Sequence, residues 1–174
     1  MTTPSAGGPV RVFVSYSHQD ERLMKRLSTH LAGLKKQGVI ETWYDRRIVA
    51  SDDWSEEIDE RLADAQIVLC LVSPDFLASE YCYEREMHTA LEGHDRGTKR
   101  VVPVIIRPTD WERSPLGRLQ AVPRDARPVT TWPNRDQAWI DVAKSLRQLA
   151  ESLPASKAGR RSATKATARA SKRP

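Results

Sequence analysis

The sequence predicts an α/β domain of three layers, in which a five-stranded parallel sheet lies between helices. From Val10 onward, short apolar runs alternate with segments of helical period, which is typical of a parallel sheet with helices on both faces. A chain of 174 residues suits one domain with short tails, because domains usually contain about 100 to 150 residues. Acidic residues within Tyr81 to Met87 follow an apolar strand, and α/β domains bind ligands at the carboxyl ends of their strands.

Five apolar segments are predicted to be the strands of this sheet. They are Val10 to Ser15, Val39 to Tyr44, Ile67 to Ser73, Val101 to Ile106, and Pro128 to Trp132. Because segments of helical period separate them, successive strands are expected to run parallel.

Apolar residues at helical spacing predict the helices. The first helix follows from Leu23, Leu27, Leu31 and Leu34, and Ser17 with Asp20 three residues later forms a capping-box pattern before it. The next two follow from Trp54, Ile58 and Leu62, and from Tyr83, Met87 and Leu91 before a stop at Gly93.

The second half of the chain is predicted to contain one long loop and one long helix. The segment from Arg107 to Arg127 lacks helical period, so we expect a loop with at most short helical turns. A closing helix is predicted from Asn134, near its cap, to Pro154, which ends it. Its apolar positions are Trp139, Val142, Leu146, Leu149 and Leu153.

The formal charge of +5 is unevenly distributed. Residues 155–174 contain seven Lys and Arg and no acid, so the other 154 residues have a net charge of −2. Residues 154–174 bury too little apolar surface to offset their ordering entropy, so they are predicted to be disordered, as are residues 1–9. The folded domain is then 10–153. The composition of the tail favours a solubilising segment or a linker over weak contact with nucleic-acid phosphates.

Neither a membrane segment nor a disulfide is predicted. The longest apolar run, Ile67 to Val72, is far shorter than a membrane helix, which needs about 20 residues. The start of the chain has no signal-peptide pattern, so we expect a cytoplasmic protein. Cys70 and Cys82 have no paired or metal-type spacing, and a reducing cytoplasm suits them as thiols.

Missing motifs argue against several enzyme classes. The chain has no Gly-x-x-x-x-Gly-Lys-Ser/Thr or Gly-x-Gly-x-x-Gly loop for phosphates and no Gly-x-Ser-x-Gly elbow for a nucleophilic serine. The four histidines form no His-x-x-x-His pattern, so no metal site is expected. A phospho-receiver domain would need acids after its first strand and an aspartate ending its third. Here these strands end in Ser15-Tyr16-Ser17 and Val72-Ser73-Pro74.

Three ordered segments resemble the sequence boxes of the TIR domain family. They are Val12 to His18, Trp43 to Val49 followed by Trp54, and Ser73 to Cys82. The likeness extends from about Val10 to Leu153. It implies a flavodoxin-like three-layer sandwich, assembly into a homo-oligomer through TIR–TIR contacts, and a role in signalling or immune defence. It implies no cofactor.

Part of this family cleaves the nicotinamide–ribose bond of NAD with one glutamate, and the resemblance places that glutamate at Glu86. Ala90 matches the small residue that the family has four residues later. One carboxylate suffices, because nicotinamide leaves as a neutral molecule and a single negative group can stabilise the developing oxocarbenium charge. Glu84 would point elsewhere, about 200° around a helix. The plain alternative is that Glu86 lies on a solvated helix face.

The resemblance also implies six substrate-binding residues: Ser17, His18, Ala50, Trp54, Tyr81 and Cys82. The first two would lie near the nicotinamide end of NAD, and the next two in and after a loop that covers the pocket. Trp54 would stack on a flat ring or pack in the core. The family usually has tryptophan where this chain has Cys82, so either Tyr81 supplies the aromatic wall, with one residue inserted, or the wall is missing.

These observations favour an NAD nucleosidase that yields nicotinamide and either ADP-ribose or a cyclic ADP-ribose. One rival is a non-catalytic TIR adaptor that self-associates through Asp45 to Trp54. A second is a small nucleic-acid-associated protein that acts through its basic tail. A glutamate at position 86 favours the enzyme, because scaffolding does not require it.

Overall fold

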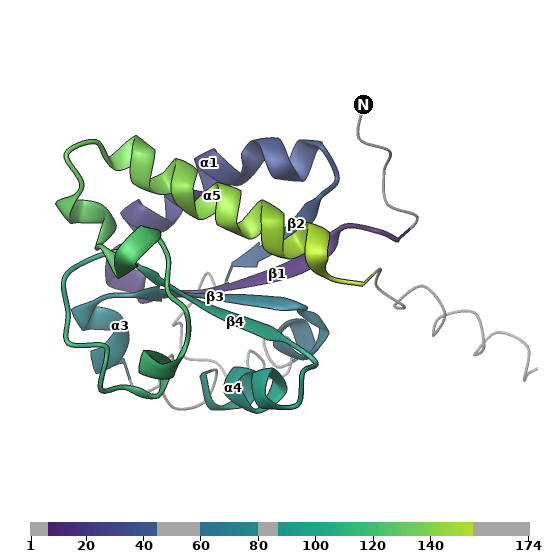
Figure 1. Cartoon of the computed structure of the whole chain (residues 1–174), viewed down its shortest axis with the longest axis horizontal. Coiled ribbons are helices and arrows are strands. Elements are labelled where there is room, and N and C mark those ends of the chain that lie inside the picture. The colour runs from purple at the N-terminus through teal and green to yellow at the C-terminus, as the bar shows by residue number, and fades with distance from the viewer. Residues whose placement is uncertain (1–6, 45–59, 80–86, 155–174) are drawn as a thin grey trace, which may run out of the picture.

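The computed structural model describes residues 7–44, 60–79 and 87–154. They form three layers, with a parallel four-stranded sheet between two layers of helices (Figure 1). The strands have the order β2-β1-β3-β4. Their bounds are β1 Val10–Ser15, β2 Ile40–Tyr44, β3 Ile67–Val72 and β4 Arg100–Ile105. The predicted α/β class is therefore confirmed, and four of the five predicted strands are present.

Among the described residues, two pairs of helices cover the sheet. Helices α1 (Glu21–Lys36) and α5 (Arg135–Ser152) lie on one face, and α3 (Pro74–Ala78) and α4 (Met87–Asp95) lie on the other (Figure 1). Residues 60–64 are also helical. None of the helices among the described residues is long and apolar enough to cross a membrane.

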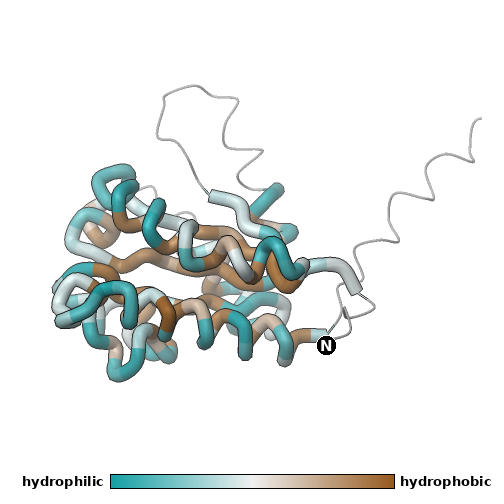
Figure 2. The backbone as a smooth tube through the Cα atoms, turned by 90° about the horizontal axis from the view of Figure 1, so that it is seen from above, coloured by the Kyte–Doolittle hydropathy of each residue, from teal (hydrophilic) through white to brown (hydrophobic). Residues whose placement is uncertain are grey.

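Both faces of the sheet are buried, because each lies against a separate apolar core. Strand β3 is buried along its whole length and supplies both cores, with Ile67, Leu69 and Leu71 on the α1/α5 side and alternate residues on the α3/α4 side. This alternation is the period of a strand. Figure 2 shows the result as hydrophobic strands enclosed by more hydrophilic helices.

The predicted fifth strand, Pro128 to Trp132, is wrong. Its centre, Val129–Thr131, is the 3-10 helix η5, in which the backbone N–H of Thr131 donates to the carbonyl of Pro128 at 2.9 Å. Val129 is fully buried in the α1/α5 core. The apolar signal was therefore real, but it marked one buried side chain in a turn.

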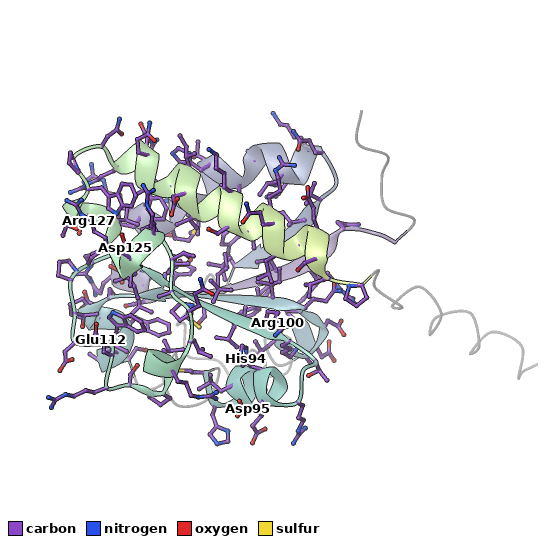
Figure 3. All side chains as sticks on the ribbon, viewed as in Figure 1. His94, Asp95, Arg100, Glu112, Asp125 and Arg127 are labelled. Atoms are coloured by element: carbon purple, nitrogen blue, oxygen red, sulfur yellow. The ribbon has the colours of Figure 1, made fainter. Side chains whose placement is uncertain are left out.

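The edge of β4 where a fifth strand would pair has other partners. Val122 forms an isolated bridge there: the N–H of Ile105 donates to its carbonyl at 2.8 Å, and its own N–H donates to Pro103 at 2.9 Å. Pro103 has no N–H to offer. The N–H of Val101 donates to Nδ1 of His94 at 3.2 Å, and Figure 3 shows His94 close to the amino end of β4.

The start of α1 differs from the predicted capping box. The Ser17 hydroxyl accepts from the N–H of Gln19 at 3.4 Å and caps the 3-10 helix η1 (His18–Asp20), which precedes α1. The Asp20 side chain makes no capping hydrogen bond, because it is engaged by residues from other elements. The predicted apolar face is confirmed, because Leu27, Leu31 and Leu34 are buried in the α1/α5 core and Leu23 packs against it. Met24 also belongs to this face.

Two further predictions concern how helices end. Gly93 does not end α4, which continues to Asp95; Gly93 instead packs on Lys99, whose Cδ would lie 2.8 Å from an added Cβ. The closing helix is confirmed as α5, and the Asn134 side chain caps it by accepting from Asp136 N–H at 3.0 Å.

The connection from Arg107 to Arg127 is a loop with short 3-10 turns, as predicted. The turns are η3 (Pro115–Arg118) and η4 (Arg124–Ala126). Gly117 is required here, because a Cβ at this position would lie 1.8 Å from the carbonyl oxygen of Glu112. The loop backbone therefore folds tightly on itself before it reaches the edge of β4.

Candidate functional site

Ser17 and His18 are the two predicted site residues that the structure describes. They follow β1 directly, at the carboxyl end of the sheet where α/β domains bind ligands. Ser17 is buried and its hydroxyl caps η1, whereas His18 is exposed. Of these two, His18 is the one whose side chain is open to a ligand.

The other predicted site residues lie outside the described residues. They are Glu86, Ala50, Trp54, Tyr81 and Cys82. Their proposed roles stay predictions. The described elements nearest in sequence are α3 and α4, and Met87, the residue after Glu86, is 2% exposed in the α3/α4 core.

Four polar side chains meet at the carboxyl ends of three strands, and we call them the strand-end cluster. Asp20 ends η1 after β1, Ser73 and Asp75 lie at the start of α3 after β3, and Arg107 follows β4. The Ser73 hydroxyl donates to Oδ2 of Asp20 and accepts from the N–H of Phe76 at 3.0 Å. Arg107 Nε donates to Oδ1 of Asp20 at 2.8 Å, and its Nη2 pairs with Asp75.

The strand-end cluster is electrostatically matched. The Asp20 side chain is 2% exposed, and a buried carboxylate is tolerated only with charged or hydrogen-bonding partners. Burial alone would lower the pKa of Arg107, but its hydrogen bonds to Asp75 and Asp20 and their negative charges raise that pKa overall. Arg107 therefore stays a cation, and it fixes η1 and α3 to the end of β4.

This cluster was not predicted from the sequence. The local pattern around Asp20 is typical of a helix cap, and Arg107 begins a segment without helical period. A usable signal was present, because polar residues come soon after each of three apolar strands, and the carboxyl ends of parallel strands meet at one edge of a sheet.

A cleft of about 670 Å³ opens beside the strand-end cluster, between the amino ends of α1 and α5. Its charged lining residues are Arg22, Arg26, Arg107, Arg135, Asp20, Asp75 and Asp136. We call it the arginine cleft. Most of its lining residues belong to α1, to α5 or to the residues just before these helices, and Figure 1 shows α1 and α5 on the face of the sheet opposite α4.

Comparison with known proteins identifies the class of this domain. The family described as TIR domain matches residues 12–149. This chain therefore belongs to the TIR domain family, and the sheet between two layers of helices described above is the TIR fold.

A protein named Uncharacterized protein y4lF, from Sinorhizobium fredii (strain NBRC 101917 / NGR234), is 51% identical over 139 residues. The match covers 80% of this chain and 43% of that protein, so the chain spans less than half the length of its relative.

The TIR domain of the Toll-related receptor TRR-2 from Hydra magnipapillata shares the fold, with a TM-score of 0.54 at 18% identity, covering 78% of this chain and 97% of that one. The TIR domains of the activated Roq1 resistosome have a TM-score of 0.45 at 25% identity, over 55% of this chain and 56% of that one.

Proposed function

We propose that this TIR domain cleaves the bond between nicotinamide and ribose in NAD, with Glu86 as its catalytic carboxylate. The observation that carries the proposal is membership of the TIR family together with a glutamate that matches the catalytic position of its NAD-cleaving members. Glu86 immediately precedes α4 in the sequence. The described elements that come before and after residues 80–86 in the sequence, α3 and α4, both contribute to the α3/α4 core.

The chemistry needs one negative group and little proton transfer. The pyridinium nitrogen of NAD takes the electrons of the breaking C–N bond, so nicotinamide leaves as a neutral molecule. A carboxylate near the ribose stabilises the oxocarbenium charge that develops on the sugar. In hydrolysis, water then adds to the same carbon and releases a proton to give ADP-ribose. In cyclisation, a nitrogen of the adenine adds there instead.

The residues that directly follow β1 support this proposal. His18 is exposed directly after β1, where the family resemblance places the nicotinamide end of NAD. The strand-end cluster ties η1, which carries His18, to the first turn of α3 through Asp20 and Ser73. A rigid link of this kind would keep the two walls of a substrate site in register.

Assembly and location complete the proposal. We infer that copies of the domain associate through TIR–TIR contacts that involve Asp45 to Trp54. A pocket completed by a neighbour would be populated rarely in the lone domain, so its apparent affinity for NAD would fall with that fraction. The proposed place of action is the cytoplasm, whose reducing conditions suit a chain with a buried cysteine such as Cys70. Residues 10–153 are proposed to be the catalytic unit.

The test is release of nicotinamide from NAD by the purified full chain, measured by chromatography over a wide range of protein concentration. Glu86→Gln should lower the rate on the order of a hundredfold or more, because it removes the charge that stabilises the transition state. Glu84→Gln is the matched control and should keep the wild-type rate. If wild-type protein releases no nicotinamide at any concentration, the enzyme proposal fails and the adaptor alternative replaces it.

A further inference from the structure

We propose that the arginine cleft is a second ligand site, which binds a phosphate-bearing small molecule independently of Glu86. The cleft volume of about 670 Å³ lies within the roughly 300 to 1,000 Å³ of small-molecule sites. Its position at the carboxyl edge of the sheet is one where α/β domains bind ligands.

Two of its arginines stand at helix ends that disfavour a cation. Arg22 is the second residue of α1 and Arg135 is the first residue of α5. The amino end of a helix carries a partial positive charge, so a cation there is repelled and an anion is attracted. Within the described parts of the chain, no ion pair or hydrogen bond engages either of these two side chains. A bound anion would offset both repulsions at once.

The other two arginines of the cleft are held in place by acids. Arg26 Nη2 lies 2.9 Å from Oδ1 of Asp136, and His30 Nε2 lies 3.1 Å from the same oxygen. These hydrogen bonds, from His30 first and then Arg26, lower the pKa of Asp136 and keep it ionised. Arg107 is held by the strand-end cluster. Because a guanidinium has five N–H donors, Arg26 and Arg107 each keep N–H groups that can donate to a ligand.

The charges of the cleft favour an anion over a cation. Its lining has four arginines and three aspartates, and the aspartates are engaged by Arg26 and Arg107. The lining therefore has a net charge of +1, because Arg107 alone faces two aspartates, and the two cations without an acid partner are Arg22 and Arg135. Two helices of 16 and 18 residues also point their amino ends at this region, and such ends bind phosphate readily.

Phosphate fits this arrangement better than a carboxylate does. Its oxygens point in several directions, so one group can accept hydrogen bonds from arginines on separate helices. Guanidinium and phosphate also pair through two parallel hydrogen bonds. The surrounding Thr130 and Asn134 add uncharged hydrogen-bonding groups for the remainder of a ligand.

The experiment is titration calorimetry of the full chain with inorganic pyrophosphate and with ADP, and with adenosine as the uncharged control. We expect saturable binding of both phosphate compounds and none of adenosine. The double variant Arg22→Gln/Arg135→Gln should bind at least about tenfold more weakly. The matched control Arg96→Gln/Arg113→Gln removes two exposed arginines outside the cleft and should bind as wild type does.

A thermal melt of each variant without ligand separates binding from folding. Arg22→Gln/Arg135→Gln should melt at or above the wild-type temperature, because it removes two cations from positive helix ends. Equal weakening in both double variants, unchanged affinity in the cleft variant, or a lowered melting temperature for it would each overturn the proposal. Glu86→Gln should leave pyrophosphate affinity unchanged. The proposal for the arginine cleft and the proposal for NAD cleavage can therefore be tested independently of each other.

Discussion

Strand β4 has a buried or half-buried cation just beyond each of its ends, and the two are satisfied in opposite ways. At the amino end, the Lys99 ammonium donates to the carbonyls of Ala63 and Ala65, both at 2.7 Å, and also to that of Leu62. At the carboxyl end, Arg107 is paired with two carboxylates. Neutral carbonyls hold one cation and negative groups hold the other.

The pKa of each cation reflects this difference. Burial lowers the pKa of Lys99; Asp64 opposes that effect and Arg11 adds to it. The pKa of Arg107 is raised, because its hydrogen bonds and the charges of Asp75 and Asp20 outweigh its burial. Lys99 therefore caps the carboxyl end of the helical segment 60–64, whereas the charged side chain of Arg107 lines the arginine cleft. The amino end of β4 therefore contributes to stability alone, whereas the carboxyl end also lines the cleft that we propose as a ligand site.

The largest expected loss of stability follows removal of Arg107. Arg107→Met should lower the free energy of unfolding by about 3 kcal/mol, because it leaves the buried Asp20 carboxylate without its cation. Urea denaturation measures this loss. Arg118→Met is the matched control, since the Arg118–Asp95 pair is more than half exposed on both sides and should contribute less than about 1 kcal/mol. Equal losses in the two variants would contradict the comparison.

A smaller loss is expected at the other end of the strand. Lys99→Met keeps the aliphatic stem but leaves three carbonyls without a donor, which should cost about 2 kcal/mol. Nicotinamide release and pyrophosphate binding should be unchanged per folded molecule, because this end of β4 is far from the strand-end cluster. A ligand-binding defect in folded Lys99→Met would remove the functional contrast between the ends.

Acid should weaken the edge of β4 by a modest amount. Burial, then Arg118 and Arg100, lower the pKa of His94 below 6.5, although Asp95 opposes them. The unfolded chain then binds more protons than the folded one between the two pKa values, so this contribution to stability is present above pH 6.5 and declines as the pH falls toward the folded pKa. Melting temperature against pH should have a shallower slope in this window for His94→Gln. An unchanged slope would show that the His94 hydrogen bond to Val101 does not couple to pH.

The smallest effect is expected for the cations of the tail. Deleting residues 155–174 removes seven Lys and Arg, yet the melting temperature should stay within about 1 °C, because the tail is predicted to bury little surface. Any salt-sensitive binding to DNA should be lost with it. A large drop in melting temperature would show that the domain does not end near Leu153.

The sequence was sufficient for the layers of the fold but not for its polar contacts. Periodicity located α1 and α5, and the Asn134 cap followed from residue type alone. The fifth strand was wrongly predicted at Pro128 to Trp132, because a short apolar run does not distinguish a strand from a turn that buries one valine. The role of Asp20 was wrongly predicted for another reason. Its local pattern suited a helix cap, whereas its actual partners, Ser73 and Arg107, are distant in sequence.

Only part of the candidate site could be predicted from the sequence. The family resemblance supplied Glu86 and its neighbours, which stay predictions, whereas the strand-end cluster and the arginine cleft required three-dimensional structure. Arg22 and Arg135 lie more than a hundred positions apart in the chain, and only the packing of α1 beside α5 brings their helix ends to one cleft. Long-range convergence of this kind leaves no local pattern in a single sequence.

The edge of β4 also limits how copies of this domain can aggregate. An open strand edge is a template on which other chains extend a sheet. Here the outward backbone donors at Val101 and Ile105 are occupied by His94 and Val122, and Pro103 between them has none. Fibril-like growth through backbone ladders is therefore blocked at this edge, and a neighbouring molecule that approaches β4 meets side chains instead.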